Sequence, residues 1–585
     1  MAEQVKIAAF LGLNKSKDGE TNLKLGEASN MSNYRITDNF KLKVIDGYSQ
    51  LFASLGTYPI RGMWHGVING TEHFLFACNG HVYKHNLTTH VNTDLGTLTD
   101  APTDFFAMDN AVYILNGYEY KKWTGTGNIT NVVGYRPCIA TGAPPTGGGT
   151  LLENVNLLTG AKYMKFVGDG MSAQYFLAEQ NIESVDYVKV NEVTKTPGTD
   201  YTVDLPSGKV TFTTAPGNSS IVEIGWAKTA TGDRDVVQKN KYHSFLGSNN
   251  ERVFLWGVGN TIVYSGLPID GSCSAEYFES GAADNVGPGE AITGMIGHSD
   301  RQLIWTKTRA YYSYEEKITV GNTTITAFPV KEINETIGNV ASGQVRLIIN
   351  NPFTVYNGVY EWIETDFKDR RNATLISQRV QPDLDEVDLS TAITYDFQTY
   401  GEYWLVVGKT VWVYGYRKDV WYRFDLNDTP TCFIEIDGCL YFGTTNGQIM
   451  KFDPELKTFN GVAISRNWET GFFDGGEATR RKNTNLVYIS MKPEQRAGVY
   501  FNFETDRNAR GMINPKKITY NLATFLHMDF NHFSFKTNYN PQPFAKMVSA
   551  IMYAYIKFKI FNNSDAEKET VLSLAFPINW GGRVR

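Results

Sequence analysis

The amino-acid sequence predicts an all-β fold: a β-propeller of about seven blades, with a small β domain inserted between blades and a further β domain at the C-terminal end. Composition is the first reason, because the chain contains 33 Tyr, 34 Phe and 54 Gly among 585 residues. Aromatic residues favour strands and glycines favour turns. A hairpin pattern that recurs along the chain is the second reason, and its spacing is the third.

The recurring hairpin is clearest at 73–86, HFLFACNGHVYKHN. Asn79 and Gly80 separate two runs of apolar and aromatic residues, and Asn-Gly tolerates the positive φ angles that a type I′ turn needs. Variants of the pattern follow at 104–125, 252–266, 301–316, 352–365, 403–426 and 432–453. Because this makes seven segments, we expect about seven blades.

The later hairpins are regularly spaced. Equivalent apolar positions of four successive hairpins lie 50, 50 and 51 residues apart, at Val253, Leu303, Phe353 and Trp404. A four-stranded blade takes about 40–50 residues. The recurrence therefore favours a propeller over the alternative, a set of unrelated antiparallel sheets. In the best blade, 403–426, the inner strands are almost continuously apolar, as expected for a sheet that is buried on both faces.

Breaks in the hairpin pattern predict the domain boundaries. Segment 136–150 is rich in Pro and Gly and is interpreted as a linker. At 545–560 apolar residues alternate with period 2, which predicts strand rather than helix. The expected organisation is an N-terminal interface arm at 1–55, first blades at 56–150, an inserted antiparallel β domain at 151–232, remaining blades at 233–460 and a C-terminal β domain at 461–585.

Charge and cysteine content restrict the partners that the protein can have. The net charge of −6 argues against tight wrapping of nucleic acid, but it leaves room for a channel through which DNA slides. Five cysteines without a C-x-x-C pair favour reduced thiols over a disulfide framework. No apolar stretch approaches the roughly 18 residues of a membrane span, and the first residues do not form a secretion signal, so we expect no membrane insertion.

No segment predicts catalysis, a cofactor or a metal. GHSD at 297–300 places His, Ser and Asp side by side, whereas the members of a catalytic triad meet in space rather than in sequence. The acidic segment 382–390 lacks the Gly and the terminal Glu of a calcium loop. The nine histidines form no pair with zinc-ligand spacing. We therefore expect a protein that is not an enzyme.

Two basic clusters are candidates for contact with DNA. KDRR at 368–371 and RRK at 480–482 would reach passing phosphates if they faced a pore. The alternatives are contacts with a partner protein or plain solvation. The candidate residues are Arg370, Arg371, Arg480 and Arg481.

Apolar residues near the start of the chain are candidates for a subunit interface. Residues 1–50 contain few strand-like runs, and their apolar side chains cannot form a core alone. We therefore expect them to be buried against another subunit, and we expect a chain without residues 1–45 to fold but not to assemble. The residues concerned are Phe10, Leu13, Leu23 and Leu25.

Segment 10–51 resembles the N-terminus of packaged-DNA stabilisation and tail nozzle proteins of short-tailed phages. The usual hydrophobic-Ser-Gly-Gly-Leu-Asn opening of that family is here Phe10-Leu11-Gly12-Leu13-Asn14, and the R-x-Gly-Tyr of many relatives is Ile45-Asp46-Gly47-Tyr48. Segments VYISMKPEQ and FNFETDR resemble the end of the same family, and GTDYTVDLPSGKVTFTTAP resembles a small β module of phage tail and tail-fibre proteins. The other shared elements are Gly26-Glu27-Ala28, Asn30 and Asn33.

The resemblance implies a structural virion protein that is assembled in the host cytoplasm. Such a protein forms a ring in the phage tail, most commonly a hexamer, and extends or closes the DNA channel. Its partners are further copies of itself, the portal and adaptor or neighbouring tail proteins, and passing double-stranded DNA without sequence specificity. The alternative is a tail-tip or baseplate propeller that binds host carbohydrate or a receptor, with Trp421 and Tyr422 as aromatic residues that could stack on sugars. A glycan-cleaving enzyme is the third interpretation.

Overall fold

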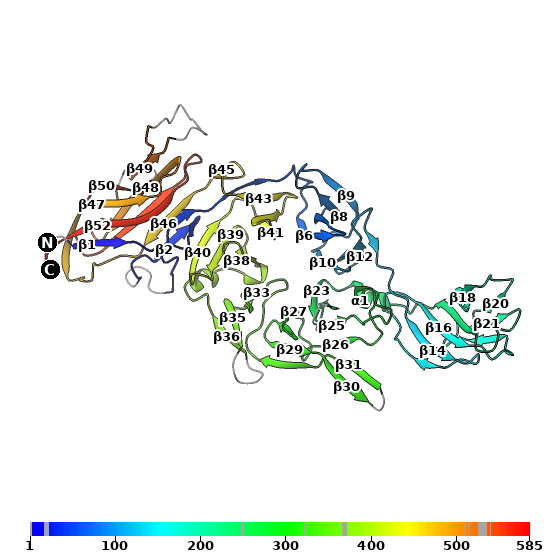
Figure 1. Cartoon of the computed structure of the whole chain (residues 1–585). Coiled ribbons are helices and arrows are strands. Elements are labelled where there is room, and N and C mark those ends of the chain that lie inside the picture. Colours follow the sequence, from blue (N-terminus) through cyan, green and yellow to red (C-terminus); the bar gives the residue numbers. More distant parts are fainter. Residues whose placement is uncertain are drawn as a thin grey trace. The chain divides into compact units, whose positions relative to one another are not determined.

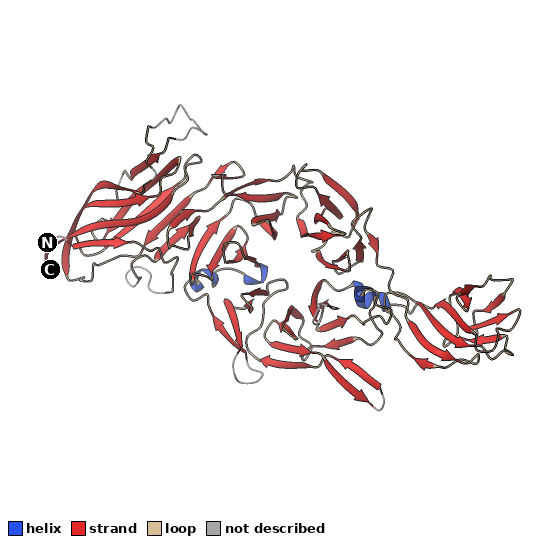
Figure 2. Ribbon diagram, in the orientation of Figure 1, coloured by secondary structure: helices blue, strands red, loops and turns tan. Residues whose placement is uncertain are grey.

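The computed structural model describes residues 3–16, 23–246, 251–320, 323–364, 371–508, 511–512, 514–523, 535–538 and 540–584. Strands dominate, as Figure 2 shows. The helices among the described residues are short: α1 (Asp233–Gln238), α2 (Gln381–Leu384) and the 3-10 turns Ser274–Glu276 and Leu389–Thr391. The chain divides into two compact units. Unit 1 is Met1–Ile60 with Ile337–Arg585, and unit 2 is Arg61–Thr336.

Four four-stranded sheets belong to unit 2. The first contains β6 (Ile60–Ile68), β7 (Thr71–Cys78), β8 (His81–His85) and β9 (Asn92–Thr97). The second contains β10 (Asp104–Met108), β11 (Ala111–Leu115), β12 (Tyr120–Trp123) and β13 (Thr130–Asn131). The third contains β23 (Tyr242–Leu246), β24 (Arg252–Val258), β25 (Thr261–Tyr264) and β26 (Ala283–Asn285). The fourth contains β27 (Ile292–His298), β28 (Arg301–Thr306), β29 (Ala310–Tyr314) and β32 (Val330–Asn334), with the hairpin β30 (Glu316–Val320) and β31 (Thr323–Ala327) inserted before its last strand.

Three further four-stranded arrangements belong to unit 1. The first contains β33 (Arg346–Ile348), β34 (Asn351–Val355), β35 (Val359–Glu364) and β36 (Arg371–Leu375). The second contains β37 (Ile393–Phe397), β38 (Glu402–Val407), β39 (Thr410–Gly415) and β40 (Val420–Asp425). The third contains β41 (Pro430–Ile436), β42 (Cys439–Thr444), β43 (Ile449–Asp453) and β5 (Gly47–Gln50), and continues into the short strands β44 (Thr458–Phe459) and β45 (Val462–Ala463).

These sheets confirm the predicted fold class, an all-β protein with propeller blades. Strands that follow one another in the chain are hydrogen-bonded neighbours, as in the four-stranded meander of a blade. Turns between them contain Asn or Asp with positive φ, such as Asn79 at 52° and Asp437 at 51°, each followed by a glycine. The hairpin signal in the sequence therefore identified the blades because it encodes the turn geometry itself.

The valine at position 413 tests the blade interior. Val413 in β39 is fully buried between Trp404 and Tyr422, its cross-strand neighbours. Replacing Val413 by Thr keeps the shape but buries a hydroxyl group, so we expect the free energy of unfolding to fall by about 1–3 kcal/mol. Urea unfolding followed by circular dichroism measures the change. The control is Val407→Thr at the half-buried end of β38, and an equal loss in both variants would argue against a fully buried position 413.

A small β domain is inserted between the second and third sheets of unit 2. It begins at Cys138, within the segment predicted as a linker, and its larger sheet contains β14 (Cys138–Ala143), β15 (Thr150–Leu151), β16 (Ala161–Val167), β18 (Ser184–Val190), β19 (Val193–Thr194) and β22 (Ile221–Ala227). The smaller sheet contains β17 (Gln174–Phe176), β20 (Tyr201–Asp204) and β21 (Lys209–Phe212). This domain has a hydrophobic cluster of its own, which includes Phe166 and Trp226.

The C-terminal domain is a sandwich of two sheets that also takes in the start of the chain. Its first sheet has the order β3 (Tyr34–Ile36), β4 (Leu42–Val44), β52 (Thr570–Arg583), β47 (Arg480–Met491) and β50 (Gln542–Tyr553), with β1 (Glu3–Ile7) also paired to β52. Its second sheet has the order β2 (Ala28–Ser32), β46 (Arg466–Thr470), β51 (Ile556–Asn562), β48 (Arg496–Thr505) and β49 (Lys516–Asn521). The rings of Phe558 and Phe576, one from each sheet, lie 4.5 Å apart. Figure 1 shows β1 and β2 among the C-terminal strands.

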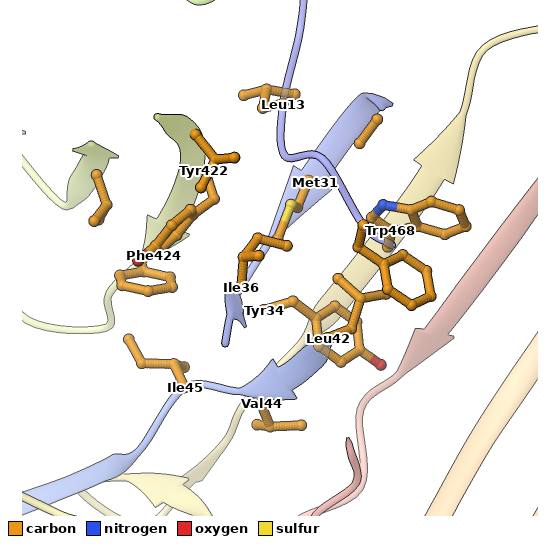
Figure 3. Packing of buried hydrophobic residues seen from close by; sticks show 14 of the residues in the cluster. Leu13, Met31, Tyr34, Ile36, Leu42, Val44, Ile45, Tyr422, Phe424 and Trp468 are labelled. Atoms are coloured by element: carbon orange, nitrogen blue, oxygen red, sulfur yellow. The ribbon is translucent and has the colours of Figure 1, made fainter. Parts of the chain in front are cut away.

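Residues 1–55 are therefore not a separate arm. Strands β1 to β4 belong to the sandwich, and β5 completes the last blade through pairs such as Tyr48 with Phe452. A single hydrophobic cluster runs from these strands into the blades of unit 1. Figure 3 shows Leu13, Met31, Tyr34 and Trp468 within it. The strand character predicted for 545–560 is confirmed, but the segment is divided into β50 and β51, which belong to different sheets of the sandwich.

Candidate assembly surfaces

The apolar residues predicted at a subunit interface lie against this chain itself. Phe10 and Leu13 are fully buried. The Phe10 ring contacts Trp468 edge-on with centroids 4.9 Å apart, and the Leu13 N–H donates to the Trp421 carbonyl oxygen at 2.6 Å. The prediction that another subunit covers them is wrong for these two residues, because the sandwich and β40 provide the core that the segment lacks. Leu23 and Leu25 are half-buried on the same unit.

The residues that carry the phage-tail resemblance hold the N-terminal segment in place. Gly12 has φ of +81°, and a Cβ there would lie 2.4 Å from the Trp421 carbonyl oxygen. Asn33, with φ of 54°, donates from Nδ2 to the carbonyl oxygens of Asp425 at 3.2 Å and Ser465 at 2.7 Å. Its Oδ1 accepts from the Asp425 N–H at 2.8 Å. Asn33 therefore links β3 to the end of β40 and to the start of the sandwich.

A second part of the same motif holds β5. A Cβ at Gly47 would lie 2.5 Å from the Thr458 carbonyl oxygen, so the close approach requires glycine. The Tyr48 hydroxyl accepts from the N–H groups of Asn427 and Asp428 and donates to Asp428 Oδ2 at 3.0 Å. The tyrosine thereby fixes the connection between the last two blades. Close packing against the backbone thus explains both Gly12 and Gly47, and no bound ligand is needed to explain them.

A buried cluster of charges lies beside this motif. Arg35 Nε is 2.6 Å from Glu402 Oε1, and Arg35 Nη1 is 3.0 Å from Asp46 Oδ2. Lys568 Nζ reaches the other oxygen of Asp46 at 3.2 Å, and the Tyr422 hydroxyl donates to Glu402 at 2.7 Å. Burial alone would raise the pKa of Asp46, but the neighbouring cations, Arg35 first, lower it to about 2. Asp46 is therefore ionised at neutral pH, and the cluster links the N-terminal segment, β38 and the sandwich.

A similar arrangement lies inside the sandwich. Arg466 and Glu569 are fully buried and 2.7 Å apart, and the Tyr34 hydroxyl donates to Glu569 at 2.7 Å. Burial lowers the pKa of Arg466, but Glu569 offsets that effect and the net shift is upward. Lys482 is also buried and donates to the carbonyl oxygens of Glu477, Arg480 and Ala554. These groups serve the structure of the domain.

The residues predicted to contact DNA are described only in part. Arg370 lies outside the described residues, and Arg371 begins β36, where only its backbone is described. Arg480 and Arg481 stand together at the start of β47. Arg480 donates to the Gly581 carbonyl oxygen at 3.2 Å, and Arg481 pairs with Asp506 at 2.9 Å. Contact of these arginines with DNA remains a prediction.

The aromatic residues considered for sugar binding are buried. Trp421 and Tyr422 are 1% and 0% exposed. Trp421 Nε1 donates to the Ile376 carbonyl oxygen at 2.9 Å, and Tyr422 donates to Glu402. Neither ring offers a face to a carbohydrate, so the proposed sugar contact is wrong for these residues and their role is blade packing.

The other polar segments have structural explanations. Ser299 has φ of 56° in the turn between β27 and β28. Asp383 pairs with Lys15 at 2.7 Å, and Asp388 accepts from the Ser390 N–H at the start of a 3-10 turn.

Within the described ranges, no group of three or more His, Cys, Asp or Glu side chains could hold a metal ion. Among those same residues, no helix has the length and apolar character to cross a membrane.

One pocket in unit 2 has a volume of about 600 Å³. Cys273 lies in the chain between two of the pocket's lining residues, and burial raises the pKa of that thiol to about 11. A thiol with a raised pKa is a weaker nucleophile at neutral pH. Its lining consists of Ala107, Met108, Asp109, Phe245, Glu251, Leu267, Pro268, Gly271, Ser272 and Ser274.

Two buried histidines make the first blade sensitive to acid. Burial lowers the pKa of His73 and of His85, with Lys84 adding to the effect at His73. Both imidazoles are therefore neutral in the folded state at a pH where the unfolded chain is protonated. We expect the melting temperature to fall as the pH drops below about 6.5, since the unfolded state then binds more protons. Calorimetry between pH 7.5 and 5.5 measures this.

The double variant His73→Gln/His85→Gln is the control for the pH experiment. It retains polar side chains of similar size but cannot be protonated in this range. The part of the pH dependence that belongs to the two histidines should disappear in this variant. An unchanged slope of melting temperature against pH would show that other groups are responsible.

Comparison with known proteins identifies no family for this chain. No family model and no curated protein matches the chain. Among solved structures, it is similar to BamB from Moraxella catarrhalis, with 8% identity and a TM-score of 0.32 over 77% of this chain and 98% of that one. It is also similar to Sqt1 from Saccharomyces cerevisiae, with 9% identity and a TM-score of 0.34 over 70% of this chain and 99% of that one. Similarity at this level carries no argument about function.

Proposed function

We propose that this protein is a structural subunit of a phage tail that forms a ring and extends or closes the DNA channel below the portal and adaptor. The resemblance at the N-terminus is the basis of the proposal. Its support is that the resembling residues Gly12, Asn33, Gly47 and Tyr48 have specific packing roles, which join the N-terminal segment to the blades and the sandwich. When the residues that two proteins share determine how the chain packs, the resemblance supports a common architecture more strongly than identical residues without such a role do.

Location in the particle tests the proposal directly. Antibodies raised against the purified protein should label phage particles from the same source at one end of the tail. Particles made without the protein should lose packaged DNA on storage, while their heads assemble normally. Absence of the protein from purified particles would refute the structural role. Labelling at the tips of fibres, with DNA retained, would favour receptor binding instead.

Weak binding of DNA is a further expectation of the proposal. A net charge of −6 suits a channel in which a polyanion slides, because each neutralised phosphate adds affinity through counterion release. We expect the isolated protein to bind duplex DNA only weakly at physiological salt and without sequence preference. Fluorescence anisotropy with two unrelated duplexes measures the affinity. Nanomolar binding, or a strong preference for one duplex, would contradict the role as a conduit.

A further inference from the structure

Among the described strands of the first sheet of the sandwich, β1, β3 and β50 each pair with one neighbour, and β3 is fully buried whereas β1 and β50 are not. In the part of the chain that the structure describes, β50 pairs only with β47, and β1 pairs only with β52. Each of these strands therefore presents a row of backbone N–H and C=O groups on its other side. Such edges pair readily with another chain unless they are short, charged or covered.

Strand β50 has few of the features that protect an edge. It runs for 12 residues, and its charged residue is Lys546. Met547 is 77% exposed and Ile551 is 62% exposed. Pro543, next to the N-terminal end of the strand, is the one proline that interrupts its backbone donors. A long, apolar edge of this kind is expected to be covered by another strand in the working protein.

We infer that β50 of one copy pairs with β1 of the next copy, so that the sheet continues from subunit to subunit. This inference rests on the proposed function as a ring subunit, because it names the surface through which the ring would form. Strand direction supports it. Neighbours alternate in direction along β1, β52, β47 and β50, since each pair is antiparallel. A second copy placed beside the first in the same orientation therefore brings β1 antiparallel to β50.

The side chains on the two edges match in one register. Glu3 lies opposite the buried Ile578, and Lys546 lies opposite the buried Val487, so both charged residues are on the inner face of the sheet. Val5 and Phe544, two residues further on, are on the same face and are half-buried at the rim of the hydrophobic cluster. Antiparallel pairing of Glu3 with Lys546 places Val5 opposite Phe544.

This register joins opposite charges and apolar side chains at the same time. Opposite charges directly across an antiparallel pair stabilise it, and so do paired apolar residues. The hydrophobic rim at Val5 in one copy would be covered by Phe544 of the next, which extends the core across the contact. The contact joins two different surfaces of the same chain, and such heterologous contacts close into rings when the rotation permits.

Charge exchange tests the register. Glu3→Lys and Lys546→Glu each place like charges opposite each other, and we expect each to raise the concentration needed for half-assembly about tenfold or more. The double variant Glu3→Lys/Lys546→Glu should restore assembly close to that of the original protein. Mass photometry across a dilution series measures assembly. Melting temperatures serve as the control for folding. Because Glu3 is exposed and Lys546 is half-buried, we expect the melting temperatures of the variants to equal that of the original protein.

Cysteine pairs test the same contact by distance. Glu3→Cys/Lys546→Cys should give a ladder of covalent multimers on a non-reducing gel after mild oxidation. The matched control Gln4→Cys/Lys546→Cys places the two thiols on opposite faces of the sheet and should give none. The five native cysteines are buried or half-buried, and single-cysteine variants measure any background from them.

The outcomes separate this inference from the proposed function. Rings that form normally in both single charge variants, and that give no ladder with the cysteine pair, would overturn the β50–β1 contact and leave the proposed function standing. A protein that is absent from phage particles and monomeric at all concentrations would overturn both. Rescue by the double charge variant, together with the ladder, would establish the contact.

Discussion

Removal of residues 1–45 is expected to destroy the fold of unit 1, rather than to leave a folded propeller that fails to assemble. The deletion removes β1 to β4 and the buried charge of Arg35. Burial of one large apolar side chain is worth about 1.5–3 kcal/mol, so eight of them contribute roughly 12–24 kcal/mol, which is as large as the whole 5–15 kcal/mol that stabilises a typical domain. The eight, none more than 2% exposed, are Phe10, Leu13, Met31, Tyr34, Ile36, Leu42, Val44 and Ile45.

Near-ultraviolet circular dichroism and limited proteolysis measure the effect of this deletion. We expect loss of the aromatic signal from unit 1 and rapid cleavage within Ile337–Arg585. The control is a chain without residues 1–6, which loses most of β1 but keeps every residue of the buried set. A truncated chain without residues 1–45 that melts like the full-length protein would show that the segment is an appendage after all.

Replacement of Arg35 by Met is expected to lower the free energy of unfolding by about 3–5 kcal/mol. The substitution keeps an apolar side chain of similar length but leaves Glu402 and Asp46 without their main partner. Glu402 is 0% exposed, so water cannot take the place of the guanidinium group. Removal of one member of a buried ion pair is costly because the remaining charge is desolvated and unpaired.

The matched control for Arg35→Met is Arg61→Met. Arg61 also pairs with a carboxylate, Asp100, at 2.8 Å, but both side chains are about 30% exposed. Exposed ion pairs contribute at most about 1 kcal/mol, so this variant should unfold almost as the original protein does. Urea unfolding of both variants measures the difference. Equal losses would show that the buried cluster around Arg35 is not a principal support of unit 1.

The sequence by itself determined the all-β class, the blades and the strand character of 545–560, but not the division of that segment into β50 and β51. These features depend on local signals: alternation with period 2 and turn residues that accept positive φ. The same signals predicted the inserted domain, although they did not predict β14, which lies in a segment rich in Pro and Gly. The side-chain pattern also shows that residues 10–51 differ from the blades, because single apolar residues stand among Asn and Gly without strand periodicity.

Only the tertiary structure decided what the N-terminal segment does. Asn33 bonds to Asp425 and Ser465, and Tyr48 pairs with Phe452, residues about 400 positions away in the chain. No local pattern encodes such a partner, since the hydrophobic effect rewards burial without specifying which surface provides it. For the same reason Phe10 and Leu13 look like interface residues in the sequence and are core residues in the fold. The free edges of β1 and β50 likewise become visible only when the order of strands in the sheet is known.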